Sequence, residues 1–101
     1  MNKLCFAVCA SLALGCAAAQ TAADDPVRYL AATCSNCHGI TGRSTGAIPS
    51  IAGLPKNDLV EKMHGFRDGT RSSTVMHQIA KGYTDPQIEQ LANYFSSRPS
   101  R

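Results

Sequence analysis

The chain alternates between amphipathic stretches that predict short α-helices and polar stretches rich in glycine. Helices are predicted over residues 26–38, 54–69, 75–80 and 84–95. Apolar residues recur at helical spacing in three of them, namely Val27, Leu30, Ala31 and Cys34; Leu59, Val60, Met63 and Phe66; and Ile88, Leu91, Ala92 and Phe95. No stretch predicts a strand. We therefore expect an all-α fold in one domain, residues 24–97, with a flexible tail over residues 98–101.

The ends of these helices carry capping signals. Asp24 or Asp25 can cap the first helix, with Pro26 at its first position. Thr84 followed three residues later by Gln87 forms the pattern of a capping box at the start of the last helix.

Between the first two helices, residues 39–53 carry the signals of a loop. Four glycines and Pro49 punctuate small polar residues there. A loop of this length without structure of its own is uncommon in a small domain unless it wraps something. We expect it to enclose a bound group, and a plain surface loop is the alternative.

The most informative residues are Cys34-Ser35-Asn36-Cys37-His38, at the end of the first predicted helix. Two cysteines three apart lie on one face of a helical turn, so both thiols can reach one flat partner. A histidine directly after them is held against the centre of that partner. This is the spacing of covalent attachment of haem c, in which Cys34 and Cys37 form thioethers and His38 is the proximal iron ligand.

Two other kinds of site use a pair of cysteines at this spacing. A thioredoxin-like redox pair requires a βαβ context, which the sequence does not predict. A zinc site requires a second Cys or His pair at regular spacing, and His64 and His77 do not supply one. Haem is therefore the favoured interpretation.

Residues 1–19 predict a signal peptide, with a basic start, an apolar stretch of small residues, and Ala17-Ala18-Ala19 as the cleavage site. Cleavage as late as Ala23 is a second possibility. A retained N-terminal anchor and lipid attachment at Cys16 are the alternatives. The apolar run is short for a membrane span, and no later stretch predicts one. We expect export to the periplasm.

Cleavage would leave Cys34 and Cys37 as the only cysteines, both consumed by haem. From Gln20 onward, nine lysines and arginines face seven acidic residues, a net charge of +2. No basic block predicts nucleic-acid binding. A mature chain of about 80 residues is small for a stable core, so we expect the haem-free form not to fold.

A bound haem gives the 39–53 loop a specific role. A backbone carbonyl near Pro49 is expected to accept the Nδ1–H of His38, which fixes the tautomer of the imidazole. Ile51 is expected to pack on the porphyrin. Three residues are candidates for the iron ligand on the opposite face of the haem. Met76 lies where loop and short helix meet, and His77 is its rival. Met63 is the other methionine after the predicted signal peptide.

Cys34-Ser35-Asn36-Cys37-His38-Gly39, residues 48–53 and Thr74-Val75-Met76 resemble the class I cytochromes c over nearly the whole mature chain. The resemblance implies four to five short helices around one covalently bound haem. It also implies crossed N- and C-terminal helices, with His38 as the proximal and Met76 as the distal iron ligand.

More narrowly, residues 42–44, 48–54, 67–69 and 76–85 resemble the cytochrome subunit of flavocytochrome c sulfide dehydrogenase. That resemblance implies an electron carrier, not itself an enzyme, that accepts electrons from an FAD-bearing sulfide dehydrogenase subunit. The chain has one haem motif, whereas some members carry two haem domains. The alternatives are a free periplasmic cytochrome c that serves an oxidase or other acceptor, and a haem-based gas sensor.

Overall fold

The computed structural model describes residues 25–100, which form four helices and no strand. They are α1 (Pro26–His38), α2 (Lys56–Asp68), α3 (Met76–Ala80) and α4 (Asp85–Ser96). The predicted all-α architecture is confirmed. The predicted signal peptide and Cys16 lie outside the described residues.

Capping side chains set the starts of the first and last helices. The Asp25 carboxylate accepts a hydrogen bond from the Val27 N–H at 3.1 Å, so Asp25 is the cap of α1. Thr84 Oγ1 accepts from the Gln87 N–H while Gln87 Oε1 accepts from the Thr84 N–H. This reciprocal pair is the predicted capping box, and it satisfies backbone donors that have no partner inside α4.

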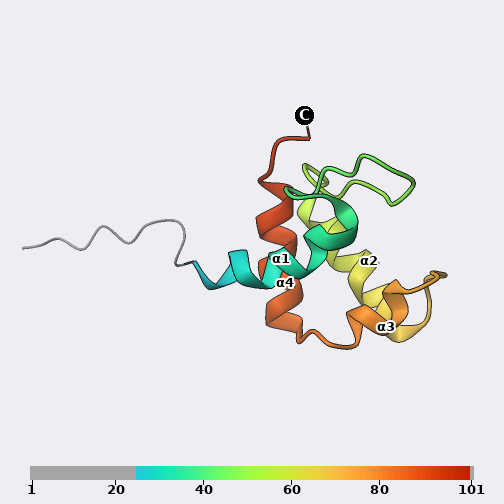
Figure 1. The fold of residues 1–101 in the computed structure, drawn as a ribbon. Helices are drawn as coiled ribbons and strands as arrows, with labels where there is room; N and C mark the ends of the chain where they lie inside the picture. Colours follow the sequence, from blue (N-terminus) through green and yellow to red (C-terminus); the bar gives the residue numbers. More distant parts are fainter. Residues whose placement is uncertain (1–24, 101) are drawn as a thin grey trace, which may run out of the picture.

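The main contacts between helices join three pairs of them. In Figure 1, α1 crosses α4, while α2 packs against both α4 and α3. The core cluster consists of Ala31, Leu59, Leu91, Ala92 and Phe95, with Cys34 and Ile51 packed against it. Small residues on both crossing helices allow the ridges of one to enter the grooves of the other.

Residues after α4 also make contacts. The Arg98 N–H donates to the Phe95 carbonyl at 3.1 Å, and its guanidinium lies 4.2 Å from the centroid of the Tyr94 ring. The tail predicted to be flexible, residues 98–101, therefore begins with a residue that contacts α4.

Candidate haem-binding site

The last turn of α1 presents the two cysteine thiols. Cys34 is half-buried against the core cluster, Cys37 is exposed, and neither forms a disulfide. Burial raises the pKa of the Cys34 thiol above its usual value, although hydrogen bonds from Thr33 and the Cys34 backbone oppose this shift. Both thiols therefore stand on the last turn of α1, and Cys34 is the more buried of the two.

His38 ends α1, and its imidazole is fixed by the following loop. His38 Nδ1 lies 2.6 Å from the carbonyl oxygen of Pro49. A carbonyl only accepts, so Nδ1 carries the proton and Nε2 keeps a lone pair. The hydrogen bond predicted from the sequence is present, and it leaves Nε2 as the nitrogen that could bind a metal.

Backbone hydrogen bonds hold the 39–53 loop in place. The Gly42 carbonyl accepts from the Ile51 N–H at 2.8 Å and from the Ala52 N–H at 3.0 Å, and the Gly53 N–H donates to the Phe95 carbonyl at 2.9 Å. Gly42 has φ +79°, and a Cβ there would lie 2.7 Å from the Phe95 ring. The loop that positions Pro49 is thus closed on itself and tied to α4.

Ile51 is half-buried and packs against the core cluster, whereas Pro49 is exposed. The structure thus brings Pro49 to His38, and it places Ile51 against the core cluster. The exposed aliphatic side chain of Ile48 lies beside them in the sequence.

Met76 comes from a different element. It is the first residue of α3, at the junction of loop and helix that the sequence predicts, and it is half-buried. Met63 is also half-buried, in the middle of α2, and Val75 beside Met76 is 51% exposed.

His77, the rival to Met76, has a partner that the sequence analysis missed. Its Nδ1 lies 3.0 Å from Ser73 Oγ, and its backbone N–H donates to the same oxygen at 2.9 Å. The signal was available, because a serine shortly before a helix commonly accepts hydrogen bonds from first-turn N–H groups.

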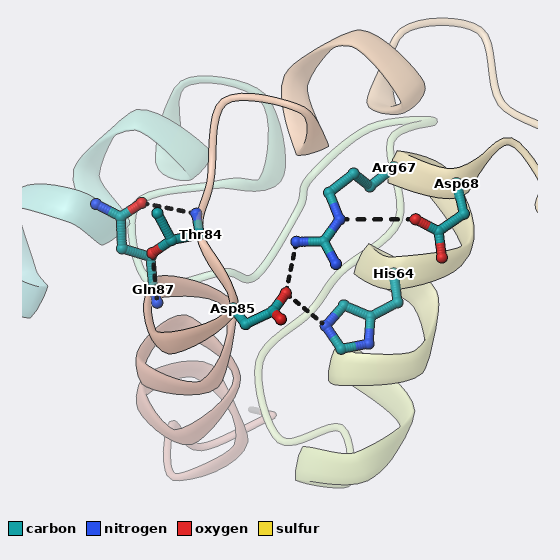
Figure 2. A network of polar contacts seen from close by, with 6 residues as sticks. All are labelled: His64, Arg67, Asp68, Thr84, Asp85 and Gln87. Atoms are coloured by element: carbon teal, nitrogen blue, oxygen red, sulfur yellow. Dashed lines mark hydrogen bonds and ion pairs between the residues drawn. The ribbon is translucent and has the colours of Figure 1, made fainter.

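An ion-pair network joins the end of α2 to the start of α4 (Figure 2). Arg67 Nη1 donates to Asp85 Oδ1 at 2.6 Å, and Arg67 Nε lies 3.7 Å from Asp68 Oδ1. Asp85 Oδ1 also lies 3.6 Å from His64 Nε2, too far for a hydrogen bond. The hydrogen bond from Arg67 holds the pKa of the Asp85 carboxyl below its usual value.

The donor atoms of the site fit a haem. Two thiols one turn apart, an imidazole with a free Nε2 and a half-buried thioether match covalent attachment and axial ligation. Among residues 25–100, no three His, Cys, Asp or Glu side chains gather to hold a metal ion, so the zinc alternative lacks a ligand set there. These residues also lack the strands that a thioredoxin-like motif requires.

A protein-family model described as Cytochrome c matches residues 27–99. This chain belongs to the cytochrome c family. The match covers the four helices except for the first residue of α1, and it includes the Cys34–His38 motif and Met76. As a cytochrome c with a single haem motif, the chain carries one covalently bound haem c and is an electron carrier rather than an enzyme.

The sequence of this cytochrome is similar to those of several bacterial proteins that carry different names. It is 41% identical over 68 residues to the cytochrome subunit of sulfide dehydrogenase from Chlorobaculum tepidum, across 67% of this chain and 62% of the relative. It is 40% identical over 73 residues to the thiosulfate dehydrogenase electron acceptor of Thiomonas intermedia, across 69% of this chain and 34% of the relative.

It is also 33% identical over 96 residues to cytochrome c-553 of Nitratidesulfovibrio vulgaris, across 90% of this chain and 91% of the relative. This cytochrome thus spans less than two thirds of the first two relatives and nearly all of the third. Within the described residues, no helix is long and apolar enough to cross a membrane.

Proposed function

We propose that Cys34 and Cys37 hold the haem through thioethers, and that His38 and Met76 are its axial iron ligands. The observation that carries this proposal is the 2.6 Å hydrogen bond between His38 Nδ1 and the Pro49 carbonyl. It orients the imidazole directly after the two thiols and reserves Nε2 for a metal. Pro49 and Ile51 complete the binding surface on the His38 side.

When bound, the haem iron supplies a centre that accepts and returns one electron. The residues of this chain determine how it does so. The Pro49 carbonyl raises the basicity of His38 through the shared proton. The Met76 thioether is a soft, neutral ligand that favours ferrous over ferric iron. With His38 and Met76 both bound to the iron, no coordination position would remain for a substrate, as suits an electron carrier.

The ligand assignment is tested on the exported, haem-loaded protein. Met76→Ala is expected to abolish the long-wavelength ferric absorption band of iron bonded to thioether sulfur and to lower the reduction potential. Met63→Ala is the matched control and is expected to leave the band in place. Loss of the band in the Met63 variant alone would transfer the assignment to α2.

We further propose that the protein is exported to the periplasm after removal of residues 1–19. There it serves as the haem subunit that accepts electrons from an FAD-bearing sulfide dehydrogenase subunit. The similarity to the cytochrome subunit of sulfide dehydrogenase supports this partner. The second candidate is a free-standing cytochrome c, which is supported by the similarity to cytochrome c-553 over nearly the full length of both chains.

Purification from the native periplasm separates the two candidates. A sulfide dehydrogenase subunit is expected to copurify with a flavoprotein and to become reduced when sulfide is added to the complex. A free carrier is expected to elute as a haem-bearing monomer without flavin. Mass spectrometry of the same material tests attachment, because the polypeptide mass must include one porphyrin and must lack residues 1–19.

A further inference from the structure

The Ser73 hydroxyl binds two different groups of His77. Its oxygen accepts the His77 backbone N–H at 2.9 Å and lies 3.0 Å from Nδ1 of the His77 ring. Because a hydroxyl can both accept and donate, Ser73 Oγ can bond to Nδ1 in either tautomer of the ring while it accepts the backbone proton. Both contacts are partly buried. One serine therefore fixes the first turn of α3 and the direction of the imidazole together.

The direction of this imidazole matters because Met76 and His77 are adjacent. Successive side chains of an α-helix point about 100° apart, so one orientation of α3 can present only one of the two to the iron. Imidazole binds haem iron as readily as a thioether does. With only five residues, α3 is too short for its own length to fix its rotation. A tether outside the helix is needed to select the ligand.

The chain before Ser73 is itself anchored to α2. The Arg71 N–H donates to the Gly65 carbonyl at 3.0 Å, and the Arg71 guanidinium lies 5.5 Å from the centroid of the Phe66 ring. A Cβ at Gly65 would lie 3.0 Å from the Cβ of Arg71, so the two backbones are in close contact. Ser73 lies two residues after this anchor. Its hydrogen bonds to His77 therefore link α3 to a part of the chain that is fixed on α2.

We propose that Ser73 is a positioning residue that holds His77 away from the haem iron and thereby leaves the sixth coordination position to Met76. This inference rests on the proposed axial ligation by Met76. Ser73 then determines whether sulfur or nitrogen binds the iron, and through this ligand it affects the reduction potential.

The test compares the haem-loaded variants Ser73→Ala, Ser73→Thr, His77→Ala and Ser73→Ala/His77→Ala by ferric absorption spectra and redox titration. Ser73→Ala is expected to lose most of the iron–sulfur band and to show a lower potential, because His77 replaces Met76. Ser73→Thr keeps the hydroxyl and is expected to keep the band. The double variant, which lacks the competing imidazole, is expected to recover the band to the level of His77→Ala.

Two results would overturn the proposal. One is a full band and unchanged potential in Ser73→Ala. The other is a double variant as deficient as Ser73→Ala, which would mean that the serine only supports the folding of the segment. Met76→Ala in the parent background tests the underlying assignment separately. A band that survives this substitution refutes ligation by Met76, whatever the serine variants do.

Discussion

The 39–53 loop and the 69–84 segment supply the two sides of the proposed haem-binding site, and they are held in different ways. The loop is fixed by backbone hydrogen bonds to itself and to α4, with glycines at positive φ. The segment is tied to α2 by a backbone hydrogen bond, from the Arg71 N–H to the Gly65 carbonyl, and otherwise mainly by side chains. These include Ser73 on His77, and the Arg67–Asp85 pair that joins the helices on either side of the segment. The His38 side therefore depends on backbone conformation, which a substitution at a glycine disturbs, whereas the Met76 side depends more on individual side chains.

Removal of both thiols is expected to have the largest effect on stability, because the haem can then no longer be attached covalently. The only large side chain that is fully buried among the described residues is Ile88. We expect the Cys34→Ala/Cys37→Ala protein to show no cooperative thermal transition by circular dichroism. Asn36→Ala, an exposed change between the two cysteines, is the control and should unfold as the parent does. A cooperative transition in the double variant would contradict this expectation.

The next largest effect is expected in the loop. Gly42→Ala forces a Cβ into a residue with φ +79° and into contact with the Phe95 ring. We expect a loss of about 2 kcal/mol or more in the free energy of unfolding, measured by denaturant titration. Gly46→Ala is the matched control, since a Cβ there has no heavy atom within 4 Å. Equal losses in both variants would show that the loop is not as tightly closed as its hydrogen bonds indicate.

A smaller effect is expected where the 69–84 segment ends. Thr84→Ala removes one half of the capping box at the start of α4. The free energy of unfolding should fall by about 1 kcal/mol, because a backbone donor of the first turn loses its acceptor. Thr84→Ser keeps the hydroxyl and should retain most of the stability. A serine variant as unstable as the alanine variant would point to the methyl group instead.

The smallest effect concerns the exposed Arg67–Asp85 pair. Arg67 lowers the pKa of Asp85 in the folded state, so the unfolded chain binds the proton more tightly. The pair therefore contributes stability at neutral pH, and this contribution is lost as pH falls below about 4, through the folded-state pKa. Melting temperatures of the parent and Asp85→Asn should differ at pH 7 and converge at low pH.

Asp58→Asn is the control for that experiment. Asp58 occupies the first turn of α2, as Asp85 does in α4, but it makes no ion pair within residues 25–100. Its substitution should change stability less. Added salt should also reduce the difference between the parent and Asp85→Asn, because exposed charges are screened. A gap that persists at low pH would assign the effect to packing.

Much of this arrangement could be predicted from the sequence because local chemistry determines it. Asp25 and the Thr84–Gln87 pair mark helix starts through bonds to residues two or three positions away. The spacing of Cys34, Cys37 and His38 is likewise a property of one helical turn. The Pro49 carbonyl could be anticipated because a metal-binding histidine needs a partner for its second nitrogen.

The contacts that could not be predicted join different elements. The Arg67–Asp85 bond and the approach of His64 depend on how α2 and α4 pack, which no periodicity specifies (Figure 2). The return of Arg71 to Gly65 is similarly a matter of chain direction after α2. Several partners suit each of these side chains equally well in sequence, and only the packing of the helices selects one.

The Phe95 carbonyl, which receives the Gly53 N–H, has a consequence for the order of assembly. In the proposed export from the N-terminus, the motif at 34–38 would cross the membrane before Phe95. Until α4 has formed, the 39–53 loop lacks this hydrogen-bond acceptor. The loop that carries Pro49 therefore reaches its final geometry only after the last helix is in place.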